Sequence, residues 1–267
     1  MVKIKLNKIL KKGRALFLAY DQGLEHGPAD FNDKNVDPVY IIDIARRGKF
    51  SAVIFHKGIA EKYSAEIKKS GVPLIVKLNG KTSLVGGEPV SRMICSVDEA
   101  VKLGAVGVGY TIYIGSEFEE EMLSEFGEIV EEAHELGLPV VLWCYPRGKS
   151  LRDLPRVGSR KSEVGSRKRS KAGKLMAYAA RVGLEVGADV VKIQSDGNLK
   201  DLEWAVESAG KCKVVVAGGA RRNADELIRD VKSAIKSGCV GVAIGRNVWQ
   251  SEEPLKLAGK LRKVVLG

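Results

Sequence analysis

The sequence predicts an α/β protein that folds as a single (β/α)8 barrel, a TIM barrel, over residues 1–267. Three observations support this prediction: eight short runs rich in Val, Ile and Leu, helical patterning between most of them, and a length of 267 residues, close to the typical size of such a barrel. The runs are nearly continuous in apolar residues, which is typical of parallel strands buried on both faces. We expect these strands at residues 15–21, 51–55, 73–79, 107–115, 139–146, 189–194, 212–218 and 241–246.

Helical patterning occupies most of the gaps between these strands. It covers residues 37–48, 94–103, 117–137, 172–187, 200–210, 223–237 and 253–265. A glycine stands between four of these helices and the next strand, at Gly48, Gly104, Gly187 and Gly238. Glycine at that place supplies a left-handed cap that turns the chain back into the sheet, so the recurrence indicates a repeated βα unit. A doubly wound sheet is the alternative, but no GxGxxG motif follows the first strand to indicate a dinucleotide site.

Composition narrows the class of protein. The chain carries 44 Lys+Arg against 33 Asp+Glu, a formal net charge of +11, and no stretch approaches the roughly 18 uncharged apolar residues of a membrane span. The basic N-terminal run lacks the apolar core of a signal peptide, so we expect a first helix or turn there, with a membrane-surface segment as the alternative. The four cysteines are scattered, which favours buried cytoplasmic thiols over disulfides or zinc ligands. These are Cys95, Cys144, Cys212 and Cys239.

Two polar side chains interrupt neighbouring apolar strands near their carboxyl ends, where barrel enzymes carry their chemistry. Lys192 lies in DVVKIQ, where burial of its ammonium would depress the pKa and produce a nucleophilic amine; a strand-end lysine or a structural ion pair is the alternative. In VLWCYPRG, Trp143 and Tyr145 share one face of the strand and Cys144 takes the other. Tyr145 on the inner face would lie beside Lys192 as a general acid or base, or be an ordinary core tyrosine.

Other polar groups follow the remaining strands. Asp21 ends the first strand, where its carboxylate would hold a ligand hydroxyl or cap a turn. We also expect side chains at the mouth of the barrel from His56, Lys57, Asn79 and Lys81, and His26 as a donor to an anion. His134, within the 117–137 helix, is expected to be solvated.

Glycines follow the last two strands, at Gly218, Gly219 and Gly245, and Arg246 stands next to the last of them. In many barrels the loops after the seventh and eighth strands expose backbone N–H groups that bind phosphate. We call these four residues the phosphate cup. No HExxH motif, Cys/His cluster or Asp-rich loop indicates a metal. Together with a buried lysine, a tyrosine and a carboxylate, the cup suggests carbonyl chemistry on a phosphorylated sugar.

Six segments of the sequence are similar to segments of a known enzyme family. The runs LAYDQGLEHGPADF, VKLNGKTSL, LWCYPRG, DVVKIQ, VVVAGGA and GVAIGRNVWQ resemble, in order and over nearly the whole chain, the archaeal-type class I fructose-bisphosphate aldolases. The resemblance implies a metal-independent reaction without a cofactor: reversible cleavage of fructose 1,6-bisphosphate to dihydroxyacetone phosphate and glyceraldehyde 3-phosphate. It also implies a cytoplasmic homo-oligomer, because family members assemble as large rings or decamers, and neither a membrane nor a nucleic acid is expected as partner.

The resemblance assigns roles to individual residues. It makes Lys192 the Schiff-base lysine, Tyr145 the proton donor and Asp21 an assisting carboxylate. The substrate- and phosphate-binding positions that it implies are Trp143, Ala217, Gly218, Gly219, Gly245 and Arg246, with His26, Lys57 and Arg147 as candidates for the distal phosphate.

Two short motifs depart from the family pattern. The run after the catalytic lysine is KIQSDG where the family often has KIKY or KTSY, and the cup reads GGARR in place of GGPK, so that Arg221 or Arg222 would replace a lysine. Three alternatives stay open. They are 2-amino-3,7-dideoxy-D-threo-hept-6-ulosonate synthase of a sister branch, another phosphate-handling aldolase with a smaller acceptor, and a barrel that binds nucleic acid or another polyanion.

The surplus charge is concentrated in one segment. Residues 147–174 contain eleven Lys+Arg and two Asp+Glu, a net of +9, which leaves +2 for the rest of the chain. We interpret residues 150–172 as a basic, flexible insertion in the loop after the fifth strand, and the motif VGSRK occurs twice within it, at 157–161 and 164–168. It is either a solvated insertion, a lid or funnel that attracts a bisphosphate, or a polyanion-binding loop.

Overall fold

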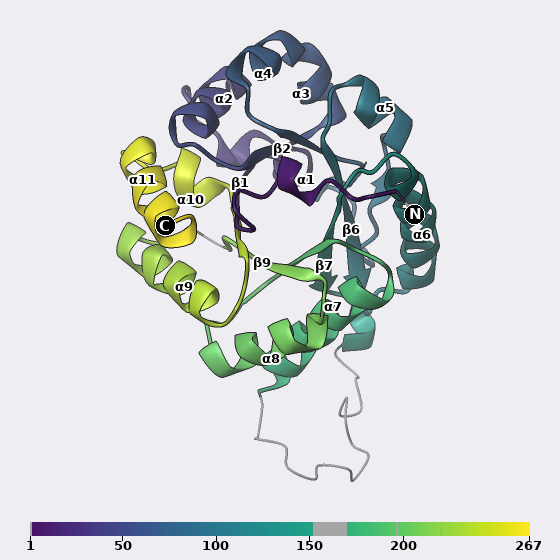
Figure 1. Cartoon of the computed structure of the whole chain (residues 1–267). Coiled ribbons are helices and arrows are strands. Elements are labelled where there is room, and N and C mark those ends of the chain that lie inside the picture. Colours follow the sequence, from purple (N-terminus) through teal and green to yellow (C-terminus); the bar gives the residue numbers. More distant parts are fainter. Residues whose placement is uncertain (1, 152–169, 196, 220) are drawn as a thin grey trace.

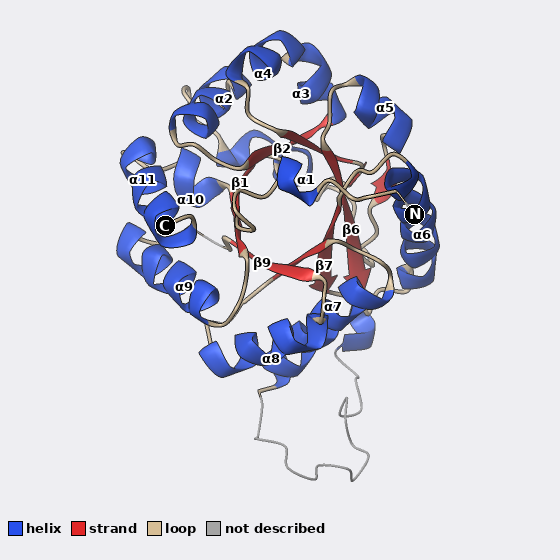
Figure 2. Ribbon diagram, in the orientation of Figure 1, coloured by secondary structure: helices blue, strands red, loops and turns tan. Residues whose placement is uncertain are grey.

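The computed structural model describes residues 2–151, 170–195, 197–219 and 221–267. Within this part of the chain, eight parallel strands close into a barrel in the order β1-β10-β9-β8-β7-β6-β3-β2, which confirms the predicted fold (Figure 2). The strands are β1 (Ala15–Ala19), β2 (Ala52–His56), β3 (Leu74–Lys77), β6 (Gly107–Ile114), β7 (Val140–Pro146), β8 (Val190–Ile193), β9 (Lys213–Ala217) and β10 (Gly241–Ile244).

Helices surround the barrel (Figure 1). They are α2 (Pro38–Arg47), α3 (Lys57–Lys62), α4 (Ser64–Ser70), α5 (Val97–Lys102), α6 (Glu119–Glu135), α7 (Lys171–Glu185), α8 (Leu199–Ala209), α9 (Ala224–Lys236), α10 (Arg246–Trp249) and α11 (Pro254–Val265). Several begin at a side chain that accepts a hydrogen bond from the first turn: Ser96 accepts from the N–H of Glu99, and Asn223 from that of Glu226. The helices α3, α4 and α10 lie outside the ranges named from the sequence pattern.

Six shorter elements complete the described chain. The N-terminal run forms a single 3-10 turn, η1 (Leu6–Lys8), and the first strand is followed by α1 (Gly23–His26) and the 3-10 turn η2 (Gly27–Asp30). A short antiparallel pair, β4 (Asn79–Gly80) and β5 (Arg92–Met93), extends the loop after β3. The basic segment connects the 3-10 turn η3 (Lys149–Leu151) to α7, and most of it, including both VGSRK motifs, lies outside the described residues.

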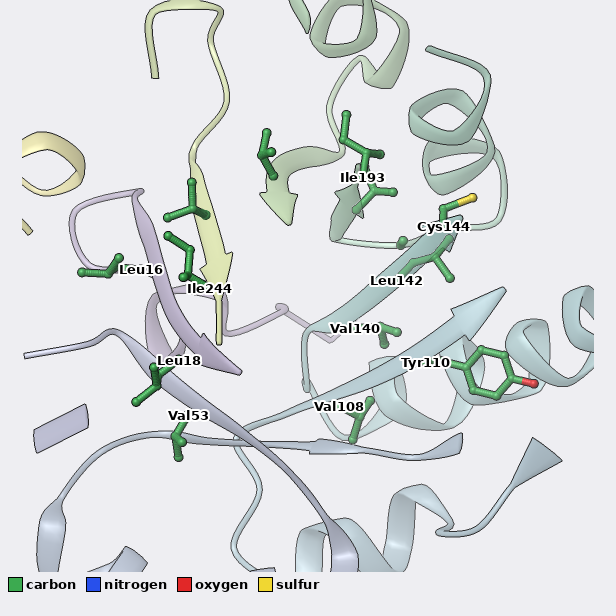
Figure 3. Packing of buried hydrophobic residues seen from close by; sticks show 14 of the residues in the cluster. Leu16, Leu18, Val53, Val108, Tyr110, Val140, Leu142, Cys144, Ile193 and Ile244 are labelled. Atoms are coloured by element: carbon green, nitrogen blue, oxygen red, sulfur yellow. The ribbon is translucent and has the colours of Figure 1, made fainter. Parts of the chain in front are cut away.

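The strands bury both faces, as expected for parallel strands. One face points into the barrel and forms a cluster with members such as Phe17, Ile54, Ile75 and Val141. The other face packs against the helices, and Figure 3 shows part of this outer cluster, including the thiol of Cys144. Because side chains alternate along a strand, each position that faces inward can be assigned from its neighbours. The inner cluster fills the amino-terminal half of the barrel and leaves the carboxyl half to polar residues.

Two local expectations were wrong. Gly104, Gly187 and Gly238 have positive φ angles, but Gly48 has a φ of −72° and is therefore no left-handed cap. A Cβ at Gly48 would stand 2.7 Å from the carbonyl oxygen of Ile44 and 2.9 Å from the Cβ of Ala258, so glycine is required there for close packing. His134 is not simply solvated, because its Nε2 lies 2.9 Å from a carboxylate oxygen of Asp189. Both outcomes depend on distant segments that the local pattern does not report.

No helix in the described part of the chain is long and apolar enough to span a membrane.

Candidate active site

The carboxyl ends of the barrel strands enclose a cavity of about 230 Å³. Every strand of the barrel contributes at least one inward-facing residue to its lining. These are Ala19, His56, Lys77, Thr111, Tyr113, Trp143, Tyr145, Lys192, Ala217 and Ala243. Asp21, Arg147 and the four residues of the phosphate cup also line it, so the structure brings together nearly all of the predicted site residues.

Lys192 lies inside the barrel, and its side chain points into this cavity. Its backbone pairs in register with Trp143 on β7 and with Val215 on β9, and the residue is 7% exposed. Burial lowers the pKa of Lys192, whereas the carboxylate of Asp21 raises it. A lysine whose ammonium is destabilised by burial exists more often as the free amine, which is the form that attacks a carbonyl carbon.

Trp143 forms one wall of the cavity beside Lys192. The Nζ atom of Lys192 lies 5.0 Å from the centroid of the indole ring. The ring occupies space left by Gly109 on the neighbouring strand β6, where a Cβ would stand 2.3 Å from the indole. Its buried Nε1 has no hydrogen-bond partner among the described residues. A buried donor without a partner is costly, so this N–H is available to a substrate oxygen.

Tyr145 follows Trp143 on the inner face of β7. Burial, and then the negative charge of Asp21, raise the pKa of Tyr145 well above its ordinary value. The phenol therefore keeps its proton at neutral pH and can donate it. The guanidinium of Arg147 stacks on the rings of Tyr145 and Tyr113, at 5.4 and 5.5 Å from their centroids.

Asp21 reaches the cavity from the end of β1. The Nε2 atom of His56 lies 2.9 Å from the backbone oxygen of Asp21, and its Nδ1 lies 3.3 Å from that of Lys77. Burial and the nearby Lys77 lower the pKa of His56, which keeps the imidazole neutral. A neutral imidazole carries one N–H, so His56 donates to one of these two backbone oxygens and adds no charge to the site.

The phosphate cup is built where β9 and β10 end side by side. The side chain of Asn247 donates to the carbonyl oxygen of Gly218 at 2.9 Å and accepts from the N–H of Arg222 at 2.8 Å, which joins the two loops. A Cβ at Gly245 would stand 2.5 Å from the carbonyl oxygen of Ala19, so only glycine allows this close approach. The guanidinium of Arg222 pairs with Asp230 on α9 and is not among the groups that line the cavity.

Two of the candidates for the distal phosphate lie elsewhere. Because His56 points into the barrel, the next residue points out, and the ammonium of Lys57 bonds to the carboxylate of Glu99 at 2.9 and 3.1 Å. The expectation that Lys57 reaches the mouth is therefore wrong. His26 lies outside the cavity lining. Its Nδ1 lies 2.6 Å from a carboxylate oxygen of Asp30, and that oxygen also lies 3.6 Å from the guanidinium of Arg246. His26 therefore belongs to the side of the phosphate cup, not to the distal side.

Three charged residues of the cavity, Glu25, Lys81 and Lys77, had little or no role assigned to them from the sequence. A carboxylate oxygen of Glu25 lies 3.4 Å from the guanidinium of Arg147 and 4.0 Å from the ammonium of Lys81. Glu25 therefore brings two cations close together at the mouth. Lys77 faces the cavity from β3 and is 4% exposed. The signal that pointed to Lys192, a lysine inside an apolar strand, is equally present in LIVKLN and would have found Lys77. No group of three or more His, Cys, Asp or Glu in the described residues could hold a metal ion.

A (β/α)8 barrel with a buried amine, a protonated phenol and a phosphate cup has the parts of a Schiff-base lyase. The chain belongs to the DeoC/LacD family of aldolases, whose family model matches residues 15–251. It is 45% identical to the class 1 fructose-bisphosphate aldolase of Thermoproteus tenax over 96% of this chain and 91% of that protein.

A solved structure and a more distant relative agree with this placement. An archaeal fructose-1,6-bisphosphate aldolase, solved with its catalytic lysine covalently bound to the carbinolamine intermediate of the substrate, superposes with a TM-score of 0.85 and 43% identity over 98% of both chains. The chain is 31% identical to 2-amino-3,7-dideoxy-D-threo-hept-6-ulosonate synthase 1 of Archaeoglobus fulgidus, over 98% of this chain and 90% of that protein.

Proposed function

We propose that this chain is a class I, Schiff-base fructose-bisphosphate aldolase that acts in glycolysis and gluconeogenesis. It cleaves fructose 1,6-bisphosphate reversibly to dihydroxyacetone phosphate and glyceraldehyde 3-phosphate. The observation that carries the proposal is the buried amine of Lys192, placed between the phosphate cup and the protonated phenol of Tyr145 in one cavity.

The chemistry follows from these positions. The free amine of Lys192 adds to the C2 carbonyl of the open-chain sugar and forms a carbinolamine. Tyr145 donates the proton with which the carbinolamine hydroxyl leaves as water, and the nitrogen becomes an iminium. The iminium draws the electron pair of the C3–C4 bond, so that cleavage produces a neutral enamine instead of a free enolate. Asp21, whose negative charge favours the cationic form of Lys192, stabilises the iminium.

Two cationic regions accommodate the two phosphates of the substrate. The cup, with Gly218, Gly219, Gly245 and Arg246, would hold the phosphate on C1, next to the carbon that bonds to Lys192. At the mouth of the cavity, Arg147 and Lys81, which both pair with Glu25, would hold the distal phosphate. Ala217 and Trp143 would complete the wall along the substrate. The binding energy of both phosphates orients the reacting carbonyl.

A substrate panel tests the proposed function. The purified chain is expected to cleave fructose 1,6-bisphosphate, measured as triose phosphate released, at least tenfold more efficiently than it forms 2-amino-3,7-dideoxy-D-threo-hept-6-ulosonate. The reason is the pair of cations at the mouth, which match a second phosphate. The reverse preference would assign the chain to the synthase, and the absence of both activities would reject the proposal.

Replacement of Arg147 tests the distal phosphate site. Arg147→Gln is expected to raise the KM for fructose 1,6-bisphosphate by about 10- to 100-fold, as expected from the loss of a charge-assisted pair of roughly 1.5–3 kcal/mol. The KM for fructose 1-phosphate should change less than threefold, because that substrate has no distal phosphate. Steady-state kinetics with both sugars measure the difference, and an equal rise for both would place Arg147 elsewhere.

We further propose that residues 1–267 form one domain and that the enzyme is a cytoplasmic homo-oligomer. The barrel strands span the chain from β1 to β10 in one closed sheet, which supports a single domain. The four cysteines are free, buried thiols, which fits a reducing compartment. The oligomer rests on the family resemblance.

A further inference from the structure

Lys77 is a second buried lysine of the cavity, and the mechanism above gives it no task. It ends β3, where its backbone pairs with His56 on β2 and Gly109 on β6, and only 4% of the residue is exposed. A charged ammonium in a desolvated cavity is costly, and replacing it by an apolar side chain would ordinarily be neutral or stabilising. A second lysine at this place therefore needs a reason beyond stability.

Asn79 holds the ammonium of Lys77 in one orientation. Lys77 donates to the side-chain oxygen of Asn79 at 2.7 Å and to its backbone oxygen at 3.0 Å. The same side-chain oxygen accepts from the N–H of Thr111 at 2.8 Å, and the amide nitrogen donates to the carbonyl oxygens of Thr111 and Ser91. Asn79 is thus fully engaged and cannot rotate. The third N–H of Lys77 has no partner among the described residues of this cavity lining.

Lys77 lies along the expected path of the substrate. Its Nζ is 5.4 Å from the centroid of the Trp143 ring, the same ring that Lys192 contacts. In the barrel, the strands follow one another from β9 and β10, which carry the phosphate cup, through β8 and β7 to β6 and β3. A sugar that bonds to Lys192 at C2, with its C1 phosphate in the cup, would lie along the ring of Trp143, which places the atoms beyond C2 on the side of β6 and β3.

We propose that Lys77 is a second catalytic lysine, which donates its remaining N–H to the oxygen on C4 and stabilises the negative charge that develops there when the C3–C4 bond is made or broken. The proposal rests on the proposed function. In cleavage, the phenolate of Tyr145, left after the carbinolamine has lost water, takes the proton of the C4 hydroxyl. The O–H electron pair forms the C4 carbonyl, and the C3–C4 pair moves into the enamine and neutralises the iminium nitrogen.

The charges around Lys77 make this role dependent on pH. Burial, together with the positive charge of Lys192, lowers the pKa of Lys77 to about 8, against the opposing effects of Asp21 and Glu25. His56, another titratable neighbour, is kept neutral by burial and by Lys77 itself. Lys77 is therefore cationic below pH 8 and loses its charge above it, so the carbon–carbon step should weaken as the pH rises through about 8.

The first experiment separates enamine formation from the carbon–carbon step in Lys77→Met. Dihydroxyacetone phosphate alone forms the imine, trapped with borohydride, and exchanges its C3 proton with deuterated water, and neither reaction involves an oxygen on C4. Both should stay within threefold of the unmodified enzyme. Cleavage of fructose 1,6-bisphosphate should fall by about 10²- to 10³-fold, the effect of removing one donor to a developing oxyanion. The exposed Lys102 provides the matched control Lys102→Met, which should leave all three rates unchanged.

Three outcomes would overturn the proposal for Lys77. These are cleavage by Lys77→Met within threefold of the unmodified rate, a loss of exchange equal to the loss of cleavage, and a loss of trapping in a folded variant. A failure of the proposed function is distinguishable, because the unmodified enzyme would then form no trapped adduct and cleave no bisphosphate.

A second measurement needs no variant. In the unmodified enzyme, the ratio of cleavage to proton exchange should fall about tenfold for each pH unit above 8. Tyr145 does not titrate in this range, because its pKa is raised well above its ordinary value. A ratio that stays constant between pH 6 and about 9.5 would overturn the role of Lys77 as a charged donor, whatever the variant does.

Discussion

Lys192→Met is expected to abolish cleavage of fructose 1,6-bisphosphate, with a loss of at least about 10⁴-fold in kcat, because the variant lacks the amine that forms the covalent electron sink. In the unmodified enzyme, borohydride and dihydroxyacetone phosphate should produce one adduct, mapped to Lys192 by peptide mass spectrometry. The lowered pKa of this buried amine is the physical reason, since it makes the nucleophilic form available at neutral pH.

The stability of Lys192→Met provides the control for this loss. Methionine has a similar volume and needs no hydrogen bonds, so the variant should melt at the same temperature as the unmodified chain or higher. An adduct on Lys77, the other buried lysine of the cavity, would contradict the assignment of the nucleophile. So would full activity in a folded Lys192→Met protein.

Tyr145→Phe is expected to lower kcat for cleavage by about 10²- to 10⁴-fold, the usual contribution of a positioned acid or base. Because burial keeps the phenol protonated, the hydroxyl is the proton donor that the carbinolamine needs, and phenylalanine removes only this group. The ring on which Arg147 stacks remains. The imine should still accumulate on long incubation with dihydroxyacetone phosphate, since the equilibrium of its formation does not depend on the donor.

A matched control for this variant is Tyr20→Phe. Tyr20 is also buried and also donates its hydroxyl, to the backbone oxygen of Asn35 at 2.6 Å, and it belongs to the outer cluster and not to the cavity lining. Its loss should lower stability and leave kcat unchanged. If Tyr145→Phe keeps more than half of the activity, the proton donor lies elsewhere, and Tyr113, which pairs in register with Tyr145 and also lines the cavity, is the next candidate.

Much of the site was predictable because it depends on periodicity within single strands. Trp143 and Tyr145 are two residues apart and therefore share a face, and Cys144 necessarily takes the other. The same rule excludes Lys57 once His56 is known to point inward. The orientation of His56 is not evident from the sequence, and Lys57 therefore remained a candidate phosphate ligand.

Other features depended on contacts between distant segments. His134 pairs with Asp189 across 55 positions, and Gly48 is required by a contact with Ala258 on α11. Lys81 and Arg147 become one cationic region only because both approach Glu25. No local pattern reports such pairs, because each requires the chain to return to a place that its neighbours in sequence do not indicate.

The sequence by itself determined the barrel, the inward-facing lysine of β8 and the glycine loops of the phosphate cup, because strand period, apolar runs and backbone freedom are local properties. The tertiary structure alone decided that Lys77 and Lys192, which are 115 positions apart, contact the same indole ring. Closure of the barrel places β3 and β8 on either side of β6 and β7, and closure is a property of all the strands together. The sequence indicated one buried lysine, and the tertiary structure shows a second one in the same cavity.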